Sequence, residues 1–336
     1  MPYTMKSLAL ACAALGTITF GSGATAFAAD SITFRYGHMN APNSVAGKQA
    51  DLFASLIEKK TNGAIKVKVY PSSQLGKLQE LAEGVSTGTI AMSHNTAAGI
   101  GSLYGPFAGL DTPYLYRDVD HLMKVVDTNS PVMKKLNEGL IKSAGARVLY
   151  SFYFGTRQLT ANKAVYSPAD LKGVKIRAIP FPIYMTTVEG LGAVPVPVDW
   201  SEVPTALATG VVMGQENPIE TIYASKVYEH QTHVMLTGHI MGAEMVVIND
   251  QTWQKLSPEL QAALTEVAAE VRAKATQMTL DAEKGDLAKI EATGTKIIAP
   301  ADGLKVDEFR KGVKALVKER LTKDYGDMYA EIETIQ

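Results

Sequence analysis

The stretch from residue 31 to residue 70 reads SITFRYGHMNAPNSVAGKQADLFASLIEKKTNGAIKVKVY and contains three structural signals in succession. Residues 31–37 alternate between apolar and polar side chains, which is typical of a strand. Residues 44–61 carry apolar side chains at helical spacing, and Asn62-Gly63 ends that helix. Residues 64–70 alternate again and stop before a proline. A strand, a helix and a second strand in one pass form the unit of a parallel sheet, so the stretch predicts an α/β protein.

Two long strand-like runs and one long helix extend this pattern. The runs cover residues 146–160 and 233–249, and helical spacing continues from Ser257 to about Gly294. A helix of that length is roughly 50 Å long, which is more than one small domain needs. The chain has 336 residues, enough for two domains. We therefore expect two α/β lobes that are separated by a cleft, hinged by the two strands and spanned by the helix.

The first 28 residues are typical of a secretory signal peptide. Lys6 supplies the positive charge, Leu8–Phe20 the apolar segment and Ala26–Ala28 the cleavage signal, so the mature chain should begin at Ala29 or close by. A transmembrane anchor is one alternative, but the apolar run is short and interrupted by glycine. A lipoprotein anchored at Cys12 is another, but the leucine-like residue of a lipobox is missing. We expect an exported protein whose mature chain has no cysteine and no transmembrane segment.

Composition and motifs exclude several classes of function. The formal net charge is −1, so the chain lacks the basic surface of a nucleic-acid-binding protein. It contains no G-x-S-x-G, P-loop or H-E-x-x-H motif, which leaves no visible catalytic machinery. His230 and His233 have the spacing of two metal ligands, but no third ligand stands at a fixed distance from them. We therefore expect no enzyme activity, no cofactor and no metal.

A short strand that contains an arginine marks the candidate binding site. In KGVKIRAIPFPIY (residues 172–184), Val174, Ile176 and Ala178 alternate as the core face of a strand. Pro180 ends the strand because proline has no N–H for the sheet ladder. Arg177 therefore stands at a carboxyl end, where open α/β sheets bind ligands. A solvated surface arginine is the alternative to a guanidinium fork that pairs with a ligand carboxylate.

Four stretches together resemble the DctP-type solute-binding proteins of TRAP (tripartite ATP-independent periplasmic) transporters. They are YPSSQLG (residues 70–76), GTRQLTANKAV (residues 155–165), LKGVKIRAIP (residues 171–180) and VPVDWSEVPTALATGVVMGQENPIETIYASKVYE (residues 196–229). The last is the most specific, and the resemblance covers essentially all of the mature chain. It implies an α/β, two-lobe periplasmic binding protein of type II-like fold. Lobe I would comprise residues 29–154 and about 243–282, and lobe II residues 155–242 and about 283–336.

The resemblance implies that the protein captures an organic acid in the periplasm and delivers it to the membrane permease subunits. Arg177 matches the arginine that clamps the substrate carboxylate, and Arg157 matches a second basic residue of the pocket. Asn217 matches an amide that hydrogen-bonds the carboxylate, Trp200 an aromatic over the ligand, and Asn40 a ligand-contact position. The remaining candidates for the pocket are Phe154, Phe181 and His94. The resemblance implies no cofactor, metal or nucleic acid, and we expect a monomer.

Departures from the family pattern bear on the ligand. Phe154, and Phe181 with Pro182, stand where other members often have polar residues, which predicts a less polar pocket. This favours a compact acid with an apolar or aromatic body, such as a 2-oxo or 2-hydroxy acid, over a sugar acid. A C4-dicarboxylate stays open if a second carboxylate is held by one of three polar residues, His38, His94 or Asn95.

Two other functions stay open at this point. A sensory component would present the same ligand to a membrane receptor instead of a transporter, and neighbouring permease or kinase genes would distinguish the two. An exported enzyme acting on organic acids would need a nucleophile, a metal or an acid/base pair in the cleft, and the sequence shows none.

Overall fold

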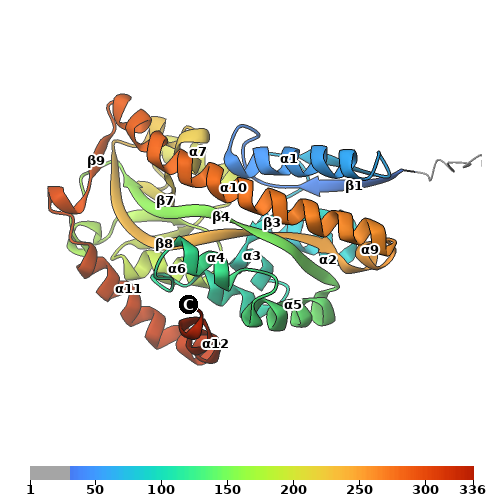
Figure 1. Cartoon of the computed structure of the whole chain (residues 1–336). Helices are drawn as coiled ribbons and strands as arrows, with labels where there is room; N and C mark the ends of the chain where they lie inside the picture. The colour runs from blue at the N-terminus through green and yellow to red at the C-terminus, as the bar shows by residue number, and fades with distance from the viewer. Residues whose placement is uncertain (1–30) are drawn as a thin grey trace, which may run out of the picture. The chain divides into compact units, whose positions relative to one another are not determined.

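The computed structural model describes residues 31–336 as an α/β fold built on one nine-stranded sheet (Figure 1). The strands are β1 (Ile32–Gly37), β2 (Ile65–Tyr70), β3 (Met92–Thr96), β4 (Ala146–Ala161), β5 (Lys175–Ala178), β6 (Val194–Pro197), β7 (Gly214–Pro218), β8 (His233–Asn249) and β9 (Lys296–Ile298). Their spatial order is β2-β1-β3-β8-β4-β7-β5-β6, with β9 paired to β8. The predicted α/β class is confirmed, whereas the predicted signal peptide and its cleavage site lie outside the described residues.

Helices pack on both faces of the sheet. The α-helices are α1 (Val45–Lys60), α2 (Leu78–Thr87), α3 (Ala97–Gly101), α4 (Val119–Val125), α5 (Pro131–Ala144), α6 (Pro182–Gly190), α7 (Val203–Ala208), α8 (Ile219–Ala224), α9 (Asp250–Gln254), α10 (Pro258–Ala292), α11 (Val306–Arg320) and α12 (Thr322–Thr334). Short 3-10 helices are η1 (Gly105–Asp111), η2 (Pro168–Leu171), η3 (Trp200–Glu202), η4 (Val227–His230) and η5 (Pro300–Asp302). None of the helices described in residues 31–336 combines the length and the apolar character that crossing a bilayer requires.

The first strand–helix–strand unit forms as its sequence predicts. β1 and β2 pair in parallel, from Ile32 opposite Ile65 onwards. Ser44 caps α1, because its hydroxyl accepts a 3.0 Å hydrogen bond from the Gly47 N–H at the first turn. The helix then turns its apolar side chains onto the sheet, where Phe53 is fully buried.

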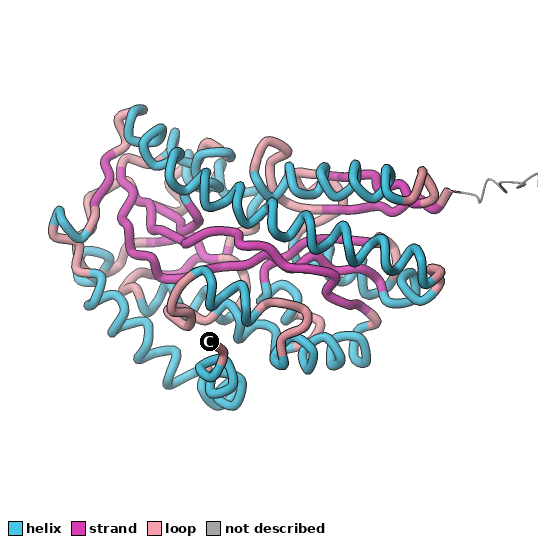
Figure 2. Tube along the Cα trace, in the orientation of Figure 1, coloured by secondary structure: helices cyan, strands magenta, loops and turns pink. Residues whose placement is uncertain are grey.

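The strands β4 and β8 run antiparallel through the middle of the sheet and connect its two halves (Figure 2). Successive side chains of β4 enter different cores, as the two-residue period of a strand requires. Phe152 and Phe154 pack in the core that includes α1 and α10, whereas Tyr153 packs in the core that includes α3 and α5. The sheet is therefore covered on both faces, and the long predicted strands are confirmed.

Helix α10 is the long helix that the sequence predicts. It has 35 residues, which corresponds to about 52 Å. Ser257 caps its first turn through the Leu260 N–H. Its first half packs with β1, β8 and α1, and Ile290 near its end packs with α7 and α8 in a separate core. The helix thus contacts both halves of the sheet.

Cap residues set the bounds of three shorter elements. Gly88 ends α2 in the left-handed region, the next residues complete that turn, and β3 begins at Met92. Ser130 caps α5 and separates it from α4. Ser167 precedes only the single turn η2 before the chain enters β5.

The C-terminal helix α12 packs against the region between η1 and α5. The Thr112 and Tyr329 hydroxyls are 2.7 Å apart, and Ile332 is buried in a core with Leu122 and residues of α5. The expected lobe boundaries remain a prediction, and this contact places residues 322–334 beside residues that were expected in the other lobe.

Candidate ligand-binding site

A small cavity lies where the carboxyl ends of β1, β3, β5 and β7 come together. Its lining residues are Met39, Asn40, Leu78, Thr96, Phe154, Arg157, Arg177, Ile179, Trp200, Asn217 and Thr221. Thr96, Arg177, Ile179 and Asn217 lie within one residue of the carboxyl end of a strand, where α/β sheets form their ligand sites. Phe154 and Arg157 lie inside β4. The cavity has a volume of about 10 Å³, room for about one water molecule. An organic acid can enter only if the walls move apart.

Arg177 is a buried cation without a counter-charge. Its side chain is 1% exposed, and its Nε donates a 2.8 Å hydrogen bond to the Val198 carbonyl. The guanidinium lies over the Trp200 ring at 5.7 Å from the centroid. Its two terminal nitrogens form no hydrogen bond or salt bridge with any residue of the described chain. Burial is the main reason that the pKa of Arg177 is lowered to about 10; Glu216 opposes this shift, and the nearby Arg157 charge contributes to it.

Arg157 is equally buried, but its charge is already balanced. It forms an ion pair with Glu216 through Nε, and its Nη2 lies 2.9 Å from Oε1 of the same carboxylate. His239 Nε2 lies 3.1 Å from the other oxygen. Burial favours the neutral acid, but the Arg157 charge and the His239 hydrogen bond outweigh it and lower the pKa of Glu216 to about 2. Of the two arginines in the cavity, Arg177 is therefore the one that lacks an anion.

Residues 36–324 match the family described as bacterial extracellular solute-binding protein, family 7 (DctP). This chain belongs to the DctP family. The 2,3-diketo-L-gulonate-binding periplasmic protein YiaO of Escherichia coli is 30% identical over 324 residues, which are 94% of this chain and 97% of that protein. The C4-dicarboxylate-binding periplasmic protein DctP of Rhodobacter capsulatus is 32% identical, and the match covers 80% of each chain.

Solved structures of similar proteins share the fold. A TRAP periplasmic solute binding protein from Sulfurospirillum deleyianum with bound succinate has a TM-score of 0.82 and 27% identity, over 90% of this chain and 99% of that one. Another from Roseobacter denitrificans with bound L-galactonate has a TM-score of 0.83 and 27% identity, over 90% and 98% of the two chains. The resemblance to DctP-type proteins and the two-lobe periplasmic-binding fold are thus confirmed.

Six of the eight candidate residues line the cavity of this DctP-family protein. Besides the two arginines, they are Asn40, Phe154, Trp200 and Asn217. Phe181 does not line it, because it precedes α6 and packs into the apolar core with Ile183. His94 does not line it either, since its ring is fully buried behind Asn40, whose Oδ1 lies 2.8 Å from His94 Nε2.

The three residues considered for a second carboxylate are all buried outside the cavity lining. The rings of His38 and His94 stack with their centroids 4.6 Å apart. Burial lowers the pKa of His38 to about 4 and, together with the neighbouring His38, lowers the pKa of His94 well below its usual range. Asn95 donates to the Leu78 carbonyl. His38 and His94 lie outside the cavity lining and their lowered pKa values favour neutral imidazoles, so they do not supply a second cation.

Three polar residues that were not among the candidates also bear on the cavity. Thr221 lines it and lies within the long family stretch, so the resemblance contained a signal for it. Thr96 lines it as well, but its hydroxyl also caps α3, and no motif marked it. Glu216, beside Asn217 in the same stretch, balances Arg157. Its partner became visible only once β4 and β7 were paired, because the two residues are far apart in sequence.

Proposed function

We propose that this protein is a periplasmic solute-binding protein of a TRAP transporter, which captures an organic acid by its carboxylate and delivers it to the membrane permease subunits. The unbalanced charge of Arg177 supports this proposal most directly. A buried cation is costly unless it is paired, and a ligand carboxylate supplies the missing anion. The names of the similar proteins agree, since they bind succinate, L-galactonate and other organic acids.

The lining of the cavity supports a role for several of the candidate residues. The free terminal nitrogens of Arg177 form a planar fork that suits bidentate pairing with a carboxylate. Arg157 adds positive potential while Glu216 keeps it in place. Asn217 supplies amide hydrogen bonds, and Trp200 and Phe154 pack against the body of the ligand. No acid/base pair or nucleophile is needed for capture and release, so the protein acts as a binding protein and not as an enzyme.

The ligand is a compact monocarboxylate with an apolar body, such as a 2-oxo or 2-hydroxy acid. Met39, Leu78, Phe154 and Ile179 make much of the lining apolar. Thr96, Thr221 and Asn40 offer polar groups for one oxo or hydroxyl substituent. A C4-dicarboxylate would need a second unpaired cation, and the histidines near β1 and β3 are neutral at physiological pH.

Thermal unfolding of the chain from Ala29 onwards, measured against a panel of acids, tests this proposal. The panel compares 2-oxo and 2-hydroxy monocarboxylates with succinate, L-galactonate and D-erythronate. A ligand at about 100 times its Kd stabilises a one-site binder by about 2.7 kcal/mol. We expect the largest stabilisation with a monocarboxylate, and none in Arg177→Ala. Arg320→Ala is the control, because Arg320 pairs with Glu189 on the exposed surface.

The possible results test the class of ligand, the role of Arg177 and the assignment as a binding protein separately. A larger stabilisation by succinate than by any monocarboxylate would show that the ligand is a dicarboxylate. It would not contradict the pairing of a carboxylate with Arg177. Equal stabilisation of Arg177→Ala and the wild type would overturn the clamp itself. Chemical turnover of the stabilising acid, detected by mass spectrometry, would overturn the assignment as a binding protein.

The cellular location is tested separately. We propose that the first 28 residues are removed on export and that the mature monomer works in the periplasm. The intact mass of the exported protein should correspond to a chain that begins at Ala29. A mass that retains Cys12 with an attached lipid would show a membrane-anchored lipoprotein instead.

A further inference from the structure

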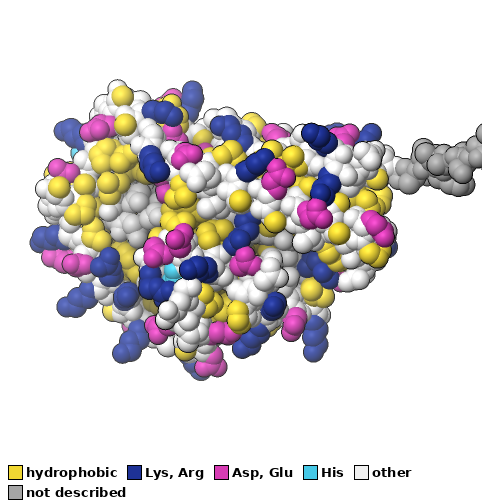
Figure 3. Space-filling view, in the orientation of Figure 1, with side chains coloured by type: hydrophobic (Ala, Val, Ile, Leu, Met, Phe, Trp, Pro, Cys, Tyr) yellow, Lys and Arg dark blue, Asp and Glu magenta, His cyan; other side chains and the backbone are white. Residues whose placement is uncertain are grey.

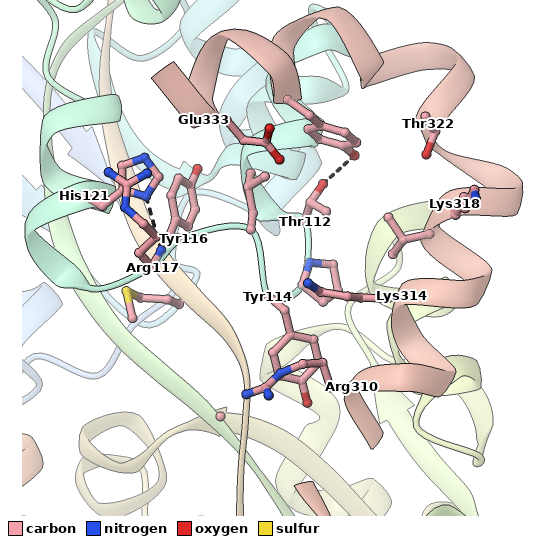
Figure 4. A pocket seen from close by; sticks show the side chains of 16 residues that line it. Thr112, Tyr114, Tyr116, Arg117, His121, Arg310, Lys314, Lys318, Thr322 and Glu333 are labelled. Carbon is pink, nitrogen blue, oxygen red and sulfur yellow. Dashed lines mark hydrogen bonds between the residues drawn. The ribbon is translucent and has the colours of Figure 1, made fainter. Parts of the chain in front are cut away.

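A second and larger groove lies between α11, α12, the segment after η1 and β8. It has a volume of about 890 Å³ and shares no lining residue with the Arg177 cavity. Figure 4 shows Lys314 and Lys318 on the α11 wall, and Arg117 with His121 on the opposite side of the groove. On the face seen in Figure 3, Lys and Arg side chains gather over α11, at the lower left.

The groove is strongly basic, although the whole chain has a net charge of −1. Arg310, Lys314 and Lys318 are spaced four residues apart, so they share one face of α11. Arg117 adds a fourth cation from the opposite wall. Glu333 is the one acidic residue that lines the groove within the described chain.

Few of these cations are neutralised by the protein itself. Arg310 pairs with Asp307 at 2.8 Å, and Arg117 donates to the Ile335 carbonyl at 2.6 Å. Lys314 and Lys318 make no salt bridge to any residue between 31 and 336, and both side chains are exposed. Arg310, Lys314 and Lys318 therefore form a positive stripe on the α11 wall, in which the charges of Lys314 and Lys318 are not compensated within residues 31–336.

The floor of the groove is aromatic and partly apolar. Tyr114 is held in the left-handed region at φ 55°, where its N–H donates 3.0 Å to the His239 carbonyl. The Arg310 guanidinium lies 5.2 Å from the centre of its ring. Leu115, Met241 and Val317 complete the apolar part. Uncharged side chains of a bound molecule can pack on this floor, while its negative charges pair with the cations on the walls.

We propose that this groove docks an acidic segment of a partner protein. From Arg310 to Lys318 the stripe extends about 12 Å along α11, longer than a single small acid. Alternate side chains of an extended segment are about 6.6 Å apart and can contact successive cations. Exposed lysines bind one isolated carboxylate weakly, because water screens each pair. Several carboxylates on one chain gain affinity together, which favours a segment over a free anion.

Fluorescence anisotropy with labelled hexaglutamate as the probe tests this inference on the chain from Ala29 onwards. The wild type should bind the probe, and affinity should fall as salt is raised from about 20 to 200 mM, since charge pairing is screened. The double variant Lys314→Gln/Lys318→Gln should lose at least about tenfold in affinity. The matched control is Lys311→Gln/Lys323→Gln, which removes two exposed lysines from α11 and α12 that do not line the groove.

Each outcome has one interpretation. Equal loss in the two double variants, or no binding to the wild type, overturns the proposal. If citrate binds as tightly as hexaglutamate and displaces it, the groove is a site for a small anion and not for a protein segment. The inference does not rest on the organic-acid function, because Arg177→Ala should bind hexaglutamate like the wild type.

Discussion

At the scale of single residues, Arg157 and Arg177 show that burial and charge balance are separate properties. Both side chains are almost inaccessible to solvent and line one cavity. Arg157 has Glu216 within the protein, whereas Arg177 has only a carbonyl and an aromatic face. The same residue type thus forms a structural ion pair at one position and a buried charge without a counter-ion at the other.

The two arginines should differ in their effect on stability. Arg157→Ala leaves the Glu216 carboxylate buried without its main partner and should lower the free energy of unfolding by about 3–5 kcal/mol. Arg177→Ala removes an unpaired buried charge and should change it by about 1 kcal/mol or less. Denaturant unfolding in the absence of ligand measures both. A loss of several kcal/mol in Arg177→Ala would indicate an internal partner for this charge.

Ligand affinity should distinguish a lysine from an alanine at position 177. Arg177→Lys keeps the charge but loses the fork, so it should bind the acid more weakly than the wild type and more tightly than Arg177→Ala. Truncating one partner of a buried charge pair costs about 2–5 kcal/mol of affinity, or roughly 30- to 5,000-fold. Titration calorimetry measures the series, and equal affinities for the lysine and alanine variants would argue against a charge-based clamp.

Glu244 on β8 predicts a pH dependence of stability. It is fully buried, and neither carboxyl oxygen has a hydrogen-bond partner in the described chain. Burial, and next the Asp111 carboxyl, raise its pKa from 4.5 to about 8, while Arg157 opposes the shift. A raised carboxyl pKa means that stability is greatest below pH 4.5 and falls as pH rises towards 8, because the folded state disfavours the charged form.

Glu244→Gln should remove this dependence. The two proteins should be similarly stable near pH 4, and above pH 8 the variant should be more stable by up to about 5 kcal/mol, taking about 1.4 kcal/mol per pKa unit. Comparing the variant with the wild type isolates Glu244 from the other buried acids. Parallel stability curves for the two proteins between pH 5 and pH 8 would contradict the assignment.

At the scale of elements, β4 bends where its sequence has a glycine. Gly155 has φ 125°, and the register between β4 and β8 shifts at this residue. A Cβ here would lie 2.6 Å from the Pro218 Cβ, so neither the backbone conformation nor the space suits another residue. On α10, Glu283 accepts hydrogen bonds from the Thr156 N–H and the Tyr153 hydroxyl, which holds the helix against this bend.

Two glycine substitutions should therefore have opposite effects. Gly155→Ala should destabilise the fold by roughly 2 kcal/mol or more, because the positive φ and the contact with Pro218 both resist a side chain. Gly285→Ala on α10 meets open space in a helix and should stabilise it by roughly 0.5–1 kcal/mol. Thermal unfolding of the two variants checks both signs, and a neutral Gly155→Ala would show that β4 does not need glycine at the bend.

At the scale of the whole molecule, several contacts join the two sides of the cavity. Lys77, before α2, forms salt bridges with Asp199 at 2.6 Å and Glu202 at 2.9 Å. The Val45 N–H at the start of α1 donates 2.7 Å to Glu220 on α8. The cavity is too small for an organic acid in this arrangement, so the two sides must move apart for the ligand to enter.

Closure around the ligand should be measurable with two probes. Residues 29–336 contain no cysteine, so in a chain that begins at Ala29, cysteines introduced at the exposed residues Lys59 and Lys172 can be labelled selectively. We expect the distribution of distances between the labels to narrow to one population when the acid is added, because the ligand favours the arrangement that contacts it from both sides. Arg177→Ala should show no change with the same acid. A distribution unaffected by saturating ligand would exclude a closing motion.

The sequence by itself determined the fold class, the long strands, the long helix and the family. The spacing of apolar residues along the chain indicates the strands and the helix, because residues on one face repeat every two positions in a strand and about every 3.6 in a helix. The family resemblance also indicated Arg177, Arg157, Asn217, Trp200 and Asn40 as a group, and the structure brings all five to one cavity. Phe181 and His94 could not be separated from that group, because sequence does not show on which side of a wall a side chain lies.

Only the tertiary structure decided which buried charges are balanced. Arg157 and Glu216 are brought together by the antiparallel pairing of β4 with β7, and Arg177 is buried beside them without a carboxylate. The basic groove also exists only in three dimensions, since Arg117 and the stripe on α11 come from distant parts of the chain. Electrostatic energy depends on the distance between charges and on their access to water, and both are set by packing between segments far apart in sequence.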